Sequence, residues 1–124
     1  MKRLILPLLL AACAANSYAL DCDKAFSTVD LNQCASQATE KVERQLNATY
    51  QQTLKEVAGM DDAAGIKAKL VDAQRLWVKF READCQAEYT KWQGGSIRNV
   101  MYSECMQNRA KQRIKELEQF PARG

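Results

Sequence analysis

The stretch that decides the fold is Ala73-Gln74-Arg75-Leu76-Trp77-Val78-Lys79-Phe80-Arg81-Glu82-Ala83-Asp84-Cys85. It is rich in apolar and aromatic residues and has no Gly or Pro, so nothing within it interrupts a helix. At 100° per residue, the apolar positions in and around it share one stripe: Ile66, Leu70, Ala73, Trp77, Phe80 and Ala87. The stretch therefore predicts a long helix that buries this stripe, with Trp77 and Phe80 as core anchors.

The start of the chain has the pattern of an export signal. Met1-Lys2-Arg3 precedes an apolar run that is too short to cross a bilayer, which needs about 20 apolar residues. Ser17-Tyr18-Ala19 supplies the small residues of a signal-peptidase site. We assign residues 1–19 to a signal peptide and 20–124 to a single domain, and we expect no transmembrane helix in the mature protein. The expected location is the periplasm or cell envelope of a bacterium.

A lipid anchor is the less favoured alternative. Leu10-Ala11-Ala12-Cys13 resembles a bacterial lipobox, in which Cys13 would be acylated. Cys13 lies within the apolar run and is preceded by few residues for a lipoprotein signal, so the soluble product is preferred.

Four cysteines remain once Cys13 is set aside: Cys22, Cys34, Cys85 and Cys105. An even number in a small exported domain predicts two disulfides, for which three pairings are possible. Cys34 with Cys85 is compatible with the helix layout. The local pairs Cys22 with Cys34 and Cys85 with Cys105 are preferred, because the latter closes across the nearer turn. A metal site is not expected, because the chain has no His and no Cys-x-x-Cys pair.

Capping and turn residues predict three long helices. Ser27-Thr28-Val29-Asp30 matches a capping box that starts a helix, which runs to about Ala58. A second helix is expected from Asp61 or Asp62 to about Trp92, and a third from Ile97, capped by Ser96, to about Glu118, before a frayed tail. Two short turns between long helices predict an all-α, up-down-up three-helix bundle of antiparallel helices, stapled by two disulfides.

Several polar residues are predicted to lie between the helices. Gln74, Arg81 and Glu88 recur at seven-residue intervals along one flank of the apolar stripe, which favours an interhelix network over a functional surface. Folding the chain back through its turns places Asn47 near Gln74, and Arg113 near Trp77. We predict that Asn47, Gln74 and Arg113 form a structural polar network beside the indole. Tyr50 is a further predicted core anchor.

Charge and residue content exclude several classes of function. Without Lys2 and Arg3, 16 basic residues balance 15 acidic ones. The first helix is acidic and the last basic, and no basic motif with interleaved aromatics indicates a nucleic-acid partner. With no His, oxidised cysteines and no Gly-rich phosphate loop, the chain offers no catalytic constellation. We predict a binding protein without enzymatic activity or cofactor.

The ordered motifs of the chain resemble those of the LprI-like lysozyme inhibitor domain, a family of small exported bacterial proteins with four cysteines, formerly a domain of unknown function. The resemblance covers essentially the whole mature chain. It is carried by Asp21-Cys22, Ser27-Thr28-x-Asp30-Leu31-Asn32-x-Cys34-Ala35, Leu46-Asn47-x-x-Tyr50, Ala73-Gln74-Arg75-x-Trp77-x-x-Phe80-Arg81-Glu82-x-Asp84-Cys85, Gly94-Gly95-Ser96 and Cys105. It implies a protein partner such as lysozyme.

Two functions are therefore weighed. The first is inhibition of a peptidoglycan-cleaving enzyme by protein–protein binding, with Gly95, Ser96 and Arg98 as candidate partner-binding residues, because an exposed basic loop suits a cleft with catalytic carboxylates. The alternative is a non-enzymatic interaction or structural module, in envelope stress or toxin immunity, with no lysozyme target. An exposed loop with basic side chains favours the first, and a broad apolar helical patch favours the second.

Overall fold

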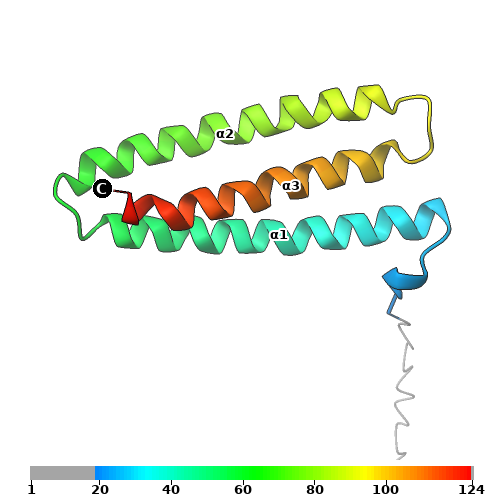
Figure 1. Cartoon of the computed structure of the whole chain (residues 1–124), viewed down its shortest axis with the longest axis horizontal. Helices are drawn as coiled ribbons and strands as arrows, with labels where there is room; N and C mark the ends of the chain where they lie inside the picture. Colours follow the sequence, from blue (N-terminus) through cyan, green and yellow to red (C-terminus); the bar gives the residue numbers. More distant parts are fainter. Residues whose placement is uncertain (1–18, 124) are drawn as a thin grey trace, which may run out of the picture.

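The computed structural model describes residues 19–123, which form a rod of three long helices (Figure 1). Helices α1 (Thr28–Val57), α2 (Ala63–Lys91) and α3 (Arg98–Gln119) run up, down and up, with short 3-10 helices η1 (Cys22–Lys24) and η2 (Phe120–Ala122) at the two ends. The predicted all-α bundle is confirmed, and no strand occurs in the described range. No helix there is both long and apolar enough to span a membrane. Cys13 and nearly all of the predicted signal peptide lie outside the described residues.

The helix ends follow the sequence signals closely but not completely. The Ser27 hydroxyl accepts the amide N–H of Asp30 at 3.0 Å, so the predicted cap of α1 is confirmed. The residue before α3 is Ile97, and no side-chain cap is formed there, so the predicted Ser96 cap is wrong. The prediction of a frayed tail over residues 121–124 is also wrong at its start, because Pro121 and Ala122 belong to η2, whose first residue, Phe120, packs against the core.

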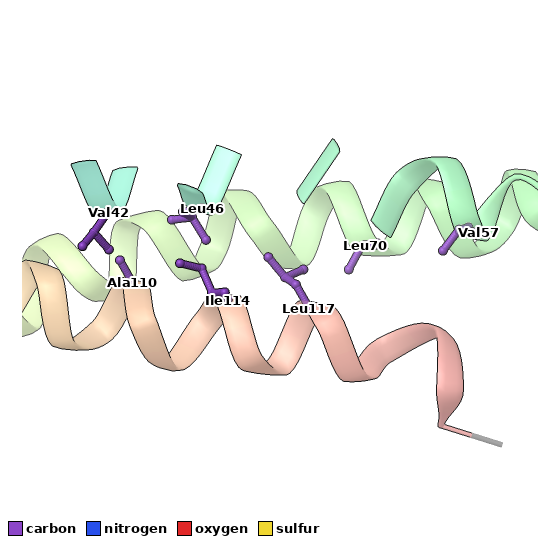
Figure 2. Packing of buried hydrophobic residues seen from close by; sticks show 7 residues of the cluster. All are labelled: Val42, Leu46, Val57, Leu70, Ala110, Ile114 and Leu117. Atoms are coloured by element: carbon purple, nitrogen blue, oxygen red, sulfur yellow. The ribbon is translucent and has the colours of Figure 1, made fainter. Parts of the chain in front are cut away.

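The apolar core occupies the half of the rod that contains the turn between α1 and α2. Val42, Leu46 and Val57 of α1 meet α3 and one leucine of α2 there (Figure 2). The remaining members of the cluster are Leu70, Ala110, Ile114 and Leu117. A hydroxyl crosses this interface, since Thr53 Oγ1 donates to the carbonyl of Leu117 at 3.1 Å. α3 packs extensively against both other helices, whereas α1 and α2 share few contacts.

The other half of the rod is held together covalently. Cys22 pairs with Cys34, and Cys85 with Cys105, at Cα–Cα distances of 5.7 and 5.5 Å, which confirms the preferred local pairing. The first bond ties η1 to α1, and the second ties α2 to α3. Cys85 is fully buried, whereas Cys22 is exposed. The disulfides thus stabilise the half of the bundle that has little apolar core.

The buried face of α2 differs from the predicted stripe. Trp77 and Tyr50 are partly buried against the core, in agreement with their predicted role, but Phe80 is 54% exposed, so its assignment as a core anchor is wrong. Arg81 takes the buried position instead, with 6% exposure. It is tolerated there because Glu43 of α1 pairs with its guanidinium, which also lies 4.7 Å from the Trp77 ring. Phe80, one residue earlier, is consequently turned towards solvent.

Candidate protein-binding end of the bundle

One end of the rod carries exposed residues from two separate segments. The start of α1 and the turn between α2 and α3 both lie there (Figure 1). Helices α1 and α3 are in contact near this end, because Gln107 of α3 donates to the Ala35 carbonyl at 3.2 Å and to Thr39 Oγ1 at 3.1 Å. We call this surface the turn end and define it by Phe26, Val29, Trp92, Gly95, Ser96, Ile97 and Arg98.

The turn end carries four exposed large apolar residues. Phe26 is 90% exposed and Val29 74%, while Trp92 and Ile97 are 37% and 39% exposed. A residue such as Phe26, just before a helix cap, often packs against the fourth helical residue as a hydrophobic staple. Its exposure shows that this staple is not formed, which leaves the ring available for contact. Two pairs of exposed apolar side chains, one at the start of α1 and one beside the α2–α3 turn, therefore lie at the same end of the rod, and exposed apolar side chains are common in protein-binding surfaces.

The turn itself is braced by α2. The Trp92 indole N–H donates to the Glu88 carboxylate at 2.9 Å, and Lys91 Nζ lies 3.4 Å from the same group. The hydrogen bond from Trp92, followed by the contacts with Lys91, lowers the pKa of Glu88 below its ordinary value despite partial desolvation and the nearby Asp84 charge. Gly95 N–H closes the turn on the Trp92 carbonyl at 2.9 Å.

Arg98 links the turn to the aromatic residues beneath it. Its guanidinium donates to the Gln93 carbonyl at 3.1 Å and lies 5.8 Å from the centre of the Tyr89 ring. Tyr89 in turn packs edge-on against Tyr102 of α3, with ring centres 6.3 Å apart. The side chain of Arg98 nevertheless remains exposed. The three predicted partner-binding residues, Gly95, Ser96 and Arg98, therefore lie together on a pre-ordered turn, and a cation stands at its edge.

The predicted polar network is formed only in part. Arg113 Nε donates to Gln74 Oε1 at 2.9 Å, and the Arg113 guanidinium lies 5.9 Å from the Trp77 ring, as predicted. Asn47 does not join them, because it is exposed on α1. Asn47 follows the buried Leu46 by one residue, a rotation of about 100° around the helix, and so points away from the bundle interior. Membership of Asn47 in the network is therefore a wrong prediction.

An acidic side chain beside the second disulfide is used by the fold. Asp84 lies close to the sulfurs of Cys85 and Cys105, a grouping that would suit a metal ion if the sulfurs were free. Both are joined in the disulfide, and the Asp84 carboxylate pairs with Arg109 of α3 at 2.7–2.8 Å. This contact links α2 to α3 beneath the turn end.

The sequence reasoning missed the apolar members of the turn end. Phe26 directly precedes the capping motif and Val29 lies within it, while Trp92 and Ile97 flank the Gly-Gly-Ser turn. In the sequence these residues look like ordinary helix-end positions. The available signal was their position at two breaks that the bundle topology brings to one end.

Comparison with known proteins places this chain among several relatives. The sequence model of the family described as "Lysozyme inhibitor LprI" matches residues 22–117. An uncharacterized protein of Rhizobium meliloti (strain 1021) is 35% identical over 108 residues, which cover 81% of this chain and 78% of that protein. The crystal structure of a DUF1311 family protein from Pseudomonas putida KT2440 matches with a TM-score of 0.70 and 22% identity, over 84% of this chain and 100% of that one. At this level of identity the structural match bears on the fold alone.

Proposed function

Because the chain belongs to the lysozyme inhibitor LprI family, we propose that it binds a peptidoglycan-cleaving enzyme of the lysozyme type in the bacterial cell envelope and blocks it through the turn end. The resemblance found in the sequence agrees with this family. The match extends from the first disulfide cysteine to the last core residue of α3, so it includes nearly the whole bundle.

The observation that carries the proposal is that the turn end is ordered, exposed and carries apolar side chains at one end of a narrow rod. Of the six large apolar residues with high exposure within residues 19–123, four lie at the turn end. Hydrogen bonds from Trp92, Gly95 and Arg98 hold the turn in place, and both disulfides lie in the same half of the bundle. An ordered loop loses less conformational entropy on binding than a flexible one, which favours tight insertion into a cleft.

Charge supports the same mode of binding. Glycoside hydrolases of this kind act through paired carboxylates that flank the scissile bond. Arg98 and Lys91 present two cations near the tip, with Lys91 67% exposed at its side chain. A cation that enters the cleft would pair with such carboxylates, and this offers a nearly neutral protein an electrostatic contribution to binding without overall charge attraction.

The proposed location follows from the same features. Structural disulfides are typical of oxidising compartments and rare in the cytosol, so the two disulfides support an extracytoplasmic protein. The sequence pattern of an export signal and the family of lysozyme inhibitors support the periplasm or cell envelope.

The proposal is tested by placing a charge on the turn end. Ile97→Glu introduces a carboxylate into the apolar tip, where it would face the carboxylates of the enzyme and lie among desolvated residues. We expect at least about a tenfold rise in the concentration needed for half-inhibition of lysozyme, equivalent to about 1.4 kcal/mol. Ala64→Glu is the matched control, because Ala64 is exposed at the opposite end of the rod. Equal inhibition by the two folded variants would exclude the turn end as the inhibitory surface.

A further inference from the structure

One side of α2 carries an apolar stripe that the rest of the described chain covers only in part: Ile66 packs against the core and Arg109 of α3 lies 5.6 Å from the Phe80 ring, but most of the stripe is exposed. We call it the outer face of α2 and define it by Ile66, Lys69, Ala73, Leu76, Phe80, Ala83 and Ala87. These positions alternate in steps of three and four, the spacing of a seam between two packed helices. Leu76 is 67% exposed and Phe80 54%. The other side of α2, with Leu70, Gln74, Trp77 and Arg81, is the one that meets α1 and α3.

The same face also contains a hollow. At its N-terminal part an open apolar depression of about 530 Å³ is bordered by Ile66, Lys69, Leu70, Ala73 and Phe120, together with Asp62 and Gly65. Phe80, the largest projecting side chain, lies eleven residues from Lys69, or about 16 Å along the helix axis. A projection and a depression therefore lie on one helix face at a fixed separation.

We propose that the outer face of α2 is a self-complementary interface, at which a second copy of this chain packs antiparallel so that Phe80 of each copy enters the hollow of the other. The two-fold axis would pass between Gln74 and Arg75, halfway between Lys69 and Phe80. A two-fold contact of this kind uses the same patch on both subunits, and every contact occurs twice.

The register that places Phe80 in the hollow also matches large residues with small ones. Leu76 comes level with the second copy's Ala73, and Ile66 comes level with the second copy's Ala83. Lys69 lies across from the second copy's Phe80, where its aliphatic stem can cover the ring and its ammonium group can contact the ring face. Close helix packing needs this alternation of bulky and small side chains, and the sequence supplies it in this register along about 25 Å of helix.

Charge on one flank agrees with the same axis. Asp72 and Lys79 lie on that flank two helical turns apart. Their midpoint falls within one residue of the proposed axis. In the antiparallel pair, Asp72 of each copy comes within two residues, about 3 Å along the helix axis, of Lys79 of the other. Asp72 is available for this contact, because its side chain is 64% exposed and its nearest basic group, on Arg75, is 3.9 Å away. The interface is small, on the order of 1,000 Å² in total, so we expect reversible, concentration-dependent association.

The test measures the molecular mass by sedimentation equilibrium across about 1 to 500 μM protein, a range that spans a micromolar dissociation constant. The wild type is expected to shift from monomer to dimer within this range. Phe80→Ser and Lys79→Asp should each weaken association by about tenfold or more, and Lys79→Asp/Asp72→Lys should restore it by reversing both charges. Val29→Ser, which alters an exposed apolar residue on the turn end, should leave association unchanged.

Three outcomes would overturn the proposal. The first is a wild type that stays monomeric over the whole concentration range. In that case, an effect of Phe80→Ser on lysozyme binding would assign the outer face of α2 to the enzyme and not to a second copy. The second is a dimer that is insensitive to Phe80→Ser. The third is a double charge reversal that fails to restore association while its circular dichroism spectrum shows native helix content. Because the readout is self-association, failure of the inhibitor proposal would not alter it.

Discussion

Loss of Glu43 is expected to destabilise the bundle far more than loss of any exposed acidic residue. Both terminal nitrogens of Arg81 bond to the Glu43 carboxylate, one of them at 3.5 Å. Its Nε has no acceptor within the described part of the chain, and the residue is 6% exposed. Glu43→Ala would therefore leave a buried cation whose remaining neighbour is the Trp77 ring.

The magnitude follows from this burial. Removing one partner of a buried ion pair costs about 3 to 5 kcal/mol, because the other charge stays desolvated. The Glu43 side chain is 32% exposed, so water can enter the space it leaves, and we expect a cost just below that range, about 2 to 3 kcal/mol. For a domain of this size, that corresponds to a fall in Tm of roughly 10 to 20 °C.

The assay is urea and thermal unfolding of the oxidised protein, followed by circular dichroism. Glu40→Ala is the control, because Glu40 and Arg44 are both mostly exposed and 4.0 Å apart, so its loss should cost under about 0.5 kcal/mol. Glu43→Leu/Arg81→Met, which replaces the pair with apolar side chains, should recover most of the stability, to within about 1 kcal/mol of the wild type. A Glu43→Ala variant as stable as Glu40→Ala would refute the reasoning.

Three further predictions concern the core, the disulfides and the turn end. Leu117→Ala, at a residue 1% exposed, should cost about 2 to 5 kcal/mol in urea unfolding, and a loss below 1 kcal/mol would contradict its place in the core. Cys85→Ser/Cys105→Ser should cost about 3 kcal/mol and speed amide hydrogen exchange in the turn-end half more than around Leu46 and Ile114; uniform acceleration would count against a covalently held half. Glu88 has a lowered pKa in the folded state, so the stability it contributes is present above its unfolded pKa, about 4.3, and is lost as the pH falls through the folded value. Trp92 fluorescence should report this titration, and Glu88→Gln should abolish it.

Much of the fold could be predicted because its signals are local. Ser27 caps α1, and the Gly94-Gly95 pair separates α2 from α3. The disulfide pairing followed from the same topology, since Cys85 and Cys105 flank one short turn. Each of these inferences needed only neighbouring residues and the rule that consecutive long helices joined by short turns pack antiparallel.

The errors concern the side of a helix that faces the interior. Phe80 and Arg81 are adjacent, and hydropathy favours the phenylalanine for the core. The structure buries Arg81 because Glu43, 38 residues earlier, supplies its counter-charge. Folding the chain back through its turn estimates the height of Asn47 along the rod, but height does not give direction around the helix, and Asn47 is exposed. The turn end was predicted only at Gly95, Ser96 and Arg98, because the exposure of Phe26 depends on a staple that the sequence permits and the structure does not form.

The central claim is that the turn end of this rod inhibits a lysozyme. The most direct test is a titration of lysozyme activity on a peptidoglycan substrate with the purified, oxidised protein at near-physiological salt, against c-type and other lysozymes. We predict dose-dependent inhibition that saturates near one inhibitor per enzyme and is weakened by Ile97→Glu but not by Ala64→Glu. Full lysozyme activity at about 50 μM of the folded, disulfide-bonded protein, well above a micromolar dissociation constant, would contradict the claim for the enzymes tested.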